Sequence, residues 1–141
     1  MSLWPKAAMV WLTILGCAVG NGALREGLLV PAFGAVPATL VSGVILCVVI
    51  LLVTALAGRW FGPQPPARLW QVGAAWLGAT IAFELSFALL RGESFEAIAA
   101  AYTFRGGNLW PLILLTTLVA PRLVGGPERA VAGSSARRQP R

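Results

Sequence analysis

The stretch Gly20-Asn21-Gly22-Ala23-Leu24-Arg25-Glu26-Gly27 places an amide and two opposite charges inside the first long apolar segment of the chain. A second ionisable residue, Glu84, lies well inside the third apolar segment. A charge within a membrane span is unfavourable unless it faces the protein interior and meets a partner, and it is then a candidate functional group. We therefore predict that Arg25 pairs with Glu84 between the first and third helices.

The composition is that of a polytopic membrane protein. The 141 residues are 57% hydrophobic and only 11% charged, against about 25% charged in soluble proteins. The chain has no histidine, the commonest metal ligand and the commonest general base near neutral pH. We predict no catalytic residue, no metal site and no cofactor. Cys17 and Cys47 are interpreted as small buried apolar residues rather than a redox pair.

Four apolar segments are long enough to be membrane spans, since about 20 helical residues cross a hydrocarbon core of ~30 Å. The first is interpreted as a retained signal anchor, because polar residues occupy the place where a signal peptide would be cleaved. A turn is expected at residues 32–36, between Pro31 and Pro37, and a loop at residues 58–68. The fold class predicted for residues 1–124 is all-α, a single four-span transmembrane helix bundle with spans at about residues 7–30, 38–57, 70–90 and 108–124.

A short amphipathic helix is expected between the third and fourth spans, at about residues 94–104. Ser94 is its candidate N-cap, and Phe95, Ile98 and Tyr102 share one face. The segment is too short to span, so we predict that it lies at the membrane interface. Residues 125–141 are rich in Gly, Ala, Ser and Arg without an apolar period, and are predicted to form a disordered basic cytoplasmic tail.

Basic residues are unevenly distributed between the two sides of this topology. The side that holds both termini and the loop at 58–68 carries Lys6, Arg59, Arg68, Arg122, Arg129, Arg137, Arg138 and Arg141. The other side carries Arg25, Arg91 and Arg105, matched by Glu26, Glu93 and Glu96. The positive-inside rule therefore predicts a bacterial inner membrane protein with both termini in the cytoplasm. The tail is expected to contact anionic lipids of the bilayer and not nucleic acid.

Helical spacing groups the polar side chains of the first and third spans. Asn21 and Arg25 share one face, as do Thr80, Glu84 and Arg91. Glu26 lies about 100° around the helix from Arg25 and is expected to pair with Arg91 or Arg105. The predicted polar or ligand-binding cluster is Asn21, Arg25, Glu26, Thr80, Glu84 and Arg91, in which Asn21 and Thr80 satisfy the remaining hydrogen bonds of the Arg25–Glu84 pair. Two interpretations stay open: a structural clasp between helices, or a pocket for a small ion, a proton or a lipid headgroup.

Several short motifs carry a resemblance to a known group of proteins. These are Asn21-Gly22-Ala23-Leu24-Arg25-Glu26, Pro31, Gly34, Ser42-Gly43, Phe83-Glu84, Tyr102, Arg105-Gly106 and Trp110. In combination they resemble a family of small four-helix bacterial integral membrane proteins with no assigned activity. The resemblance implies the four-span topology and singles out Asn21, Arg25, Glu26 and Glu84, but it implies no substrate. A fainter similarity is to the four-span fluoride channels, although the chain lacks their threonine-phenylalanine-serine run in the third span.

Three classes of function fit these features. The favoured one is a non-enzymatic membrane protein that acts by association, as an accessory subunit or a homo-oligomer. Small residues on the first span (Gly16, Gly20) and on the third (Gly78, Ala82, Ser86) would let another helix approach closely. The alternative is a small ion or solute transporter or channel that works as a dimer. A lipid-modifying enzyme would have glutamates as acid and base, but no nucleophile or metal set accompanies them.

Overall fold

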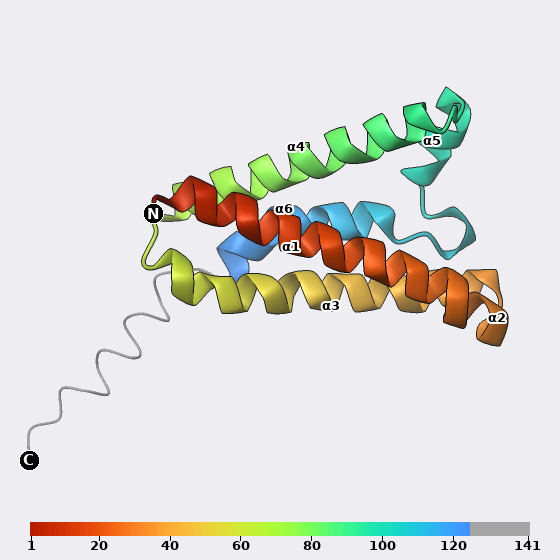
Figure 1. The fold of residues 1–141 in the computed structure, drawn as a ribbon, viewed down its shortest axis with the longest axis horizontal. Coiled ribbons are helices and arrows are strands. Elements are labelled where there is room, and N and C mark those ends of the chain that lie inside the picture. Colours follow the sequence, from red (N-terminus) through yellow and green to blue (C-terminus); the bar gives the residue numbers. More distant parts are fainter. Residues whose placement is uncertain (125–141) are drawn as a thin grey trace, which may run out of the picture.

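The computed structural model describes residues 1–124, and throughout that range the secondary structure is helical, with no strand (Figure 1). The elements in order are α1 (Leu3–Leu24), a π-helical turn η1 (Arg25–Leu29), α2 (Val30–Phe33), α3 (Ala35–Phe61), α4 (Pro66–Leu90), α5 (Phe95–Ala101), a 3-10 turn η2 (Arg105–Gly107) and α6 (Trp110–Val124). The all-α fold class is confirmed. The predicted basic tail, residues 125–141, lies outside the described residues.

Three helical segments are long and apolar enough to cross a membrane. They are Leu3–Phe33, Ala35–Phe61 and Pro66–Leu90, with 31, 27 and 25 residues. The predicted fourth span is shorter, because α6 begins at Trp110 and has 15 residues, which is about 22 Å at ~1.5 Å per residue. Three helices therefore have the length and hydropathy of membrane spans, and the fourth span stays a prediction.

The turn predicted at residues 32–36 is wrong in extent. The helix that begins as α1 continues past Pro31 to Phe33, and the reversal is made at Gly34 alone, with φ +85° and ψ 166°. The π-helical turn η1 ends at Leu29, two residues before Pro31. A proline has no N–H to donate and its ring clashes with the preceding turn, and a locally widened helix accommodates both defects.

The loop predicted at residues 58–68 is also too long. Helix α3 extends to Phe61 and α4 begins at Pro66, which leaves Gly62 (φ +71°) and three residues as the connection. Arg59 and Trp60 therefore belong to the last turn of α3. The Lys6 ammonium donates a hydrogen bond to the Trp60 carbonyl (2.8 Å) and lies 5.5 Å from the centre of the Trp60 ring. Arg59 and Trp60 can stay helical at the end of a membrane span, because their long side chains carry the guanidinium and the indole N–H out of the hydrocarbon layer to the interface.

Helix α5 occupies seven of the eleven residues predicted for the amphipathic helix. The Ser94 hydroxyl accepts a hydrogen bond from the Ala97 amide (3.2 Å), so the predicted N-cap is confirmed. The segment then turns through Gly106 and Gly107, both at positive φ, and enters α6. The Asn108 side chain fixes this connection, because its amide donates to the Ala101 carbonyl and its oxygen accepts from the Trp110 amide.

The long helices pack in the spatial order α1, α3, α6, α4, with little contact between α1 and α4. The buried core is built from all four long helices, with Val10, Ile50, Val72 and Ile113 among its residues. Helices α4 and α6 approach closely at Gly73, whose missing side chain makes room for the Leu118 carbonyl. The Trp76 indole N–H donates to the Ala7 carbonyl (2.9 Å) and ties α4 to the start of α1. Further along, α4 leans away from the other helices towards α5 (Figure 1). We call the end that holds α2 and α5 the hairpin end, and the opposite one the terminal end.

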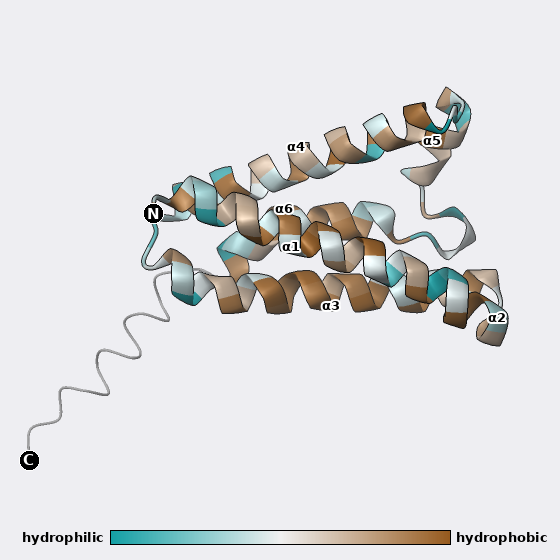
Figure 2. Cartoon of the chain, viewed as in Figure 1, coloured by the Kyte–Doolittle hydropathy of each residue, from teal (hydrophilic) through white to brown (hydrophobic). Residues whose placement is uncertain are grey.

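The outer surface of the bundle is strongly apolar. Large hydrophobic side chains are exposed along α3, including Val44, Val48, Leu52 and Leu56. Figure 2 shows the continuous hydrophobic band on α3 and more hydrophilic residues at both of its ends. Soluble monomers rarely expose an apolar surface this long. The exposed side chains are those of a protein whose solvent is lipid.

Candidate functional site

A cleft of about 560 Å³ opens between α1 and α4 in the half of the bundle near the hairpin end. Its volume lies within the range of about 300–1,000 Å³ that is usual for small-molecule sites. The cleft exists because hydrogen bonds join α1 and α4 only in the half nearer the terminal end. There the Trp11 indole N–H donates to the Thr80 hydroxyl (3.1 Å), and the bond from Trp76 to Ala7 lies further towards the terminal end.

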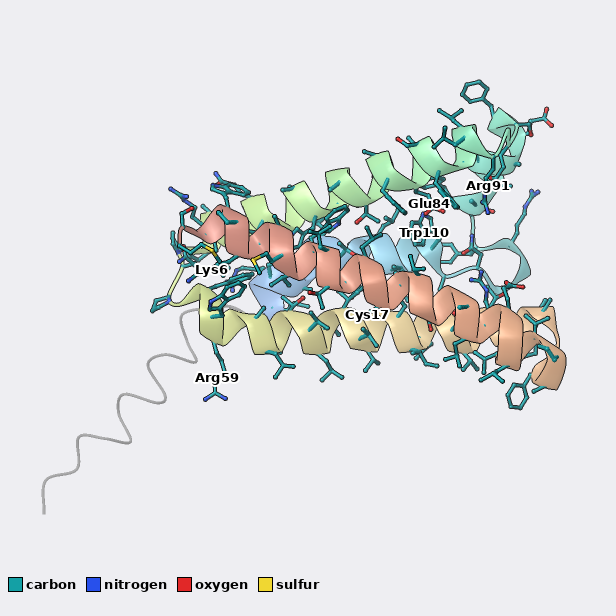
Figure 3. All side chains as sticks on the ribbon, in the orientation of Figure 1. Lys6, Cys17, Arg59, Glu84, Arg91 and Trp110 are labelled. Atoms are coloured by element: carbon teal, nitrogen blue, oxygen red, sulfur yellow. The ribbon has the colours of Figure 1, made fainter. Side chains whose placement is uncertain are left out.

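The cleft brings together five of the six residues of the predicted polar cluster. Its lining includes Asn21, Arg25, Thr80, Glu84 and Arg91. Glu26, the sixth, lies outside the cleft with an exposed side chain. Figure 3 shows Glu84 and Arg91 on α4 directed towards the start of α6, where Trp110 lies. The helical spacing that grouped these residues on the sequence therefore places them around one space.

The predicted Arg25–Glu84 ion pair is wrong. Within residues 1–124 the ion pairs join sequence neighbours: Arg25 Nε lies 3.0 Å from Glu26 Oε1, and Arg91 pairs with Glu93. The expected pairing of Glu26 with Arg91 or Arg105 is not formed either. The physical reason is the separation of α1 and α4 at this level. A neighbouring carboxylate at an exposed helix end holds a guanidinium with less restriction of side-chain freedom than a partner across the cleft would.

The hydrogen bonds predicted for Asn21 and Thr80 also differ. The Asn21 amide donates to the Ser42 carbonyl (3.1 Å) and hydroxyl (2.8 Å), so Asn21 joins α1 to α3 instead of supporting an ion pair with α4. Thr80 accepts from Trp11. No side chain of the described residues hydrogen-bonds or ion-pairs with the partly buried Glu84 carboxylate. The wall of the cleft is thus held by α1–α3 contacts, and Glu84 is left facing the space.

Three buried side-chain polar atoms lack a hydrogen-bond partner in the described part of the chain: Asn21 Oδ1, the Tyr102 hydroxyl and Trp110 Nε1. Two of them belong to residues that line the cleft, the acceptor Asn21 Oδ1 and the donor Trp110 Nε1. Buried polar atoms are nearly always hydrogen-bonded in native proteins, so each is a candidate contact for a bound molecule. The predicted cluster did not include Trp110, because nothing in its local sequence distinguishes a tryptophan at the membrane interface from one whose N–H faces a cleft.

The mouth of the cleft is held by aromatic stacking as well as by charge. The Phe83 and Phe87 rings on α4 are stacked with their centres 6.1 Å apart, and the Arg91 guanidinium lies 4.9 Å from the centre of the Phe87 ring. A cation over an aromatic face is attracted by the ring quadrupole. Arg91 is therefore positioned over the opening without a direct contact with Glu84.

Comparisons with protein families, curated proteins and solved structures find no match to this chain. The family resemblance described above therefore stays a prediction. No group of three or more His, Cys, Asp or Glu side chains in residues 1–124 could hold a metal ion. The cleft residues offer acceptors at Glu84 and Asn21, a donor at Trp110, and two guanidinium groups at the mouth.

Proposed function

We propose that this chain is a non-enzymatic integral membrane protein that acts by association, as an accessory subunit or a homo-oligomer, through the outward-facing side of α1. In this proposal α6 forms the fourth span together with the residues that precede it. The protein lies in a bacterial inner membrane with both termini in the cytoplasm. The support for this orientation is the excess of Lys and Arg at the terminal end over the charge-paired hairpin end.

The observation that carries the proposal is the exposure of the small residues of α1. Gly16 and Gly20 are exposed, and a Cβ added at either would meet nothing within 4 Å. At about 100° per residue both lie on the side of α1 opposite Trp11, Ile14 and Ala18, which line the cleft. These glycines therefore make no close contact inside the chain. In a bilayer such a pair at four-residue spacing lets a second helix backbone approach closely.

A similar face lies on α4. Gly78, Ala82 and Ser86 are exposed, and a Cβ at Gly78 would meet nothing within 4 Å. The Ser86 hydroxyl is satisfied within its own helix by the Ala82 carbonyl (2.7 Å), so the face presents no unpaired polar group to lipid. The small-residue faces of α1 and α4 point away from the cleft, which leaves both free for intermolecular contacts.

The test is a bulky substitution on the association face. In the Gly16→Leu/Gly20→Leu double variant we expect loss of the oligomer or of the co-purifying partner, because two leucines keep a second backbone at a distance. The matched control is Val44→Leu/Val48→Leu, which adds bulk at the same spacing on exposed positions of α3. The measurement is crosslinking in native membranes followed by light scattering after gentle solubilisation. Recovery of only a monodisperse monomer from the wild-type membrane would contradict the proposal.

A second candidate is an ion or solute transporter working as a dimer, and the observation in its favour is the polar cleft with Glu84 facing it. The cleft ends at the Trp11–Thr80 contact, so a pathway across the membrane requires a movement of α4 or a second chain. Tracer uptake by liposomes that hold the purified protein, lost on Glu84→Gln, would favour this candidate over the first. Vesicles impermeable to common ions and small solutes would dispose of it.

A further inference from the structure

We propose that the cleft between α1 and α4 binds a lysophospholipid with a zwitterionic, ammonium-bearing headgroup. The ligand has a single acyl chain, a glycerol with one ester and one free hydroxyl, a phosphate and an ammonium. This inference concerns the cleft alone, whereas the proposed association face lies on the opposite side of α1. Either can therefore fail without the other.

The closed end of the cleft fits an acyl chain. Its lining there is apolar and comes from three helices, with Ile14 on α1, Leu46 and Ile50 on α3, and Ile113 on α6. All four side chains are largely shielded by the surrounding helices. An acyl chain is the ligand group that such a surface binds, because close packing of its methylene groups against these side chains contributes many dispersion contacts. The cleft also opens sideways between α1 and α4, which gives a lipid a route of entry.

The next level of the cleft fits the glycerol of a lysophospholipid. Asn21 Oδ1 lacks a donor and Trp110 Nε1 lacks an acceptor among the described residues, and the partly buried Glu84 carboxylate lines the same cleft. A glycerol with one free hydroxyl and one ester supplies both, since the hydroxyl donates to Asn21 or Glu84 and the ester carbonyl accepts from Trp110. A diacyl lipid has no free glycerol hydroxyl at this level. Its second chain would also need room beside the first.

The mouth of the cleft fits a zwitterionic headgroup. Arg25 lies four residues, about 6 Å along α1, beyond Asn21 towards the hairpin end. Arg25 uses only Nε and Arg91 only Nη2 in their ion pairs, so the other guanidinium nitrogens are available to a phosphate. Glu26 and Glu93 do not line the cleft, but as the ion-pair partners of Arg25 and Arg91 they lie at its rim, within reach of an ammonium. Because both guanidiniums are already paired and Glu84 adds an unpaired carboxylate inside, the charge balance favours a zwitterion over a purely anionic headgroup.

Two other occupants fit less well. A fatty acid would bring its carboxylate to the level of Glu84, where two negative charges repel each other. A partner helix is too large. With a diameter of about 10 Å and a rise of about 5.4 Å per turn, one helical turn occupies about 420 Å³, so the cleft of about 560 Å³ holds little more than a single turn.

The first arm of the test blocks the cleft. The probe is lysophosphatidylethanolamine, titrated into the purified full chain and counted by native mass spectrometry. We expect one lipid per wild-type chain, and binding weakened at least about tenfold in Ala18→Leu, because the added side chain enters the cleft. The control is Ala23→Leu, the same change at an exposed position on the other side of α1. Equal binding by wild-type and Ala18→Leu would overturn the proposal.

The second arm tests the headgroup and does not depend on Ala18→Leu folding. Arg25→Gln is expected to weaken binding about tenfold, as loss of a charge-assisted hydrogen bond does. The control is Arg59→Gln, at the far end of the bundle, where the side chain points away from the helices (Figure 3). Monodisperse elution and an unchanged helical circular dichroism spectrum establish folding. Equal effects of the two substitutions would sink the headgroup assignment.

The third arm compares ligands. Lysophosphatidylglycerol, diacyl phosphatidylethanolamine and palmitate are each expected to bind more weakly than the probe, since they lack the ammonium, the glycerol hydroxyl and both of these, respectively. An equal affinity for any of the three would overturn the corresponding part of the proposal. The Gly16→Leu/Gly20→Leu variant should keep the lipid even where it loses the oligomer, so failure of the lipid site and failure of the association face are separate results. A protein partner that Ala18→Leu releases would also overturn the proposal.

Discussion

At the scale of single residues, three polar side chains around the cleft bond to the nearest available group. Arg25 reaches Glu26 and Arg91 reaches Glu93, while Asn21 bonds to Ser42 on the adjoining helix. Glu84 has no neighbouring cation along its own helix turn and projects into the cleft. The cleft therefore has paired cations at its rim and an unpaired acceptor inside, which is the arrangement on which the proposed ligand site depends.

Gly73 makes the closest helix contact and gives the sharpest prediction at this scale. A Cβ at Gly73 would lie 1.9 Å from the Leu118 carbonyl oxygen, a backbone atom that cannot rotate away. We expect Gly73→Ala to destabilise the packing of α4 on α6 by about 1–3 kcal/mol, as overpacking does. The measurement is the midpoint of thermal or denaturing-detergent unfolding.

The control for this prediction is Gly78→Ala on the same helix. A Cβ there meets nothing within 4 Å, and alanine is the better helix former, so the change should be neutral or slightly stabilising. Equal unfolding midpoints for the Gly73 and Gly78 variants would show that α4 and α6 do not approach as closely as the structure has them.

At the scale of elements, the α2–α3 reversal depends on one residue. Gly34 has φ +85° and ψ 166°, a backbone conformation open essentially to glycine only. A Cβ at Gly34 meets no atom within 4 Å, so its effect is backbone strain alone. We expect Gly34→Ala to destabilise the α1–α3 hairpin by about 1–3 kcal/mol, read from the unfolding midpoint.

Gly27→Ala provides the comparison for Gly34. It lies in the helical turn η1 with equal free space and without a positive φ, so its midpoint should stay near that of the wild type. If Gly34→Ala is as stable as Gly27→Ala, the reversal has another conformation. The conformation of the reversal at Gly34 matters for the cleft, because it determines the positions of Arg25 and Asn21 relative to Ser42 on α3.

At the scale of the whole molecule, both described chain ends of the bundle lie at the terminal end, and α5 lies at the other (Figure 1). With the basic residues gathered at the terminal end, we expect that end to face the cytoplasm. In intact cells a membrane-impermeant thiol reagent should label Ser94→Cys and not Gln64→Cys. After the membrane is permeabilised, Gln64→Cys should also become labelled.

The unmodified chain supplies the background for this labelling experiment, because Cys17 and Cys47 are free thiols within α1 and α3. Labelling of Gln64→Cys in intact cells would place the basic end outside and refute the orientation. Ser94 and Gln64 both lie in connections between helices, and each substitution removes one local hydrogen bond, from the Ala97 amide to Ser94 or from Gln64 to the Phe61 carbonyl.

The sequence by itself determined the all-helical class, three of the four predicted apolar spans as long helices, the Ser94 cap and five of the six polar residues that line one cleft, because hydropathy, capping and helical spacing are local properties. It misjudged the turn at Pro31 and the loop after Ala57, where a π-helical turn and an interfacial tryptophan extend the helices. Only the tertiary structure decided that α1 and α4 stand apart at Glu84. The distance between α1 and α4 depends on how α3, α6 and Gly73 pack. The sequence pattern of α1 or of α4 alone does not predict that distance.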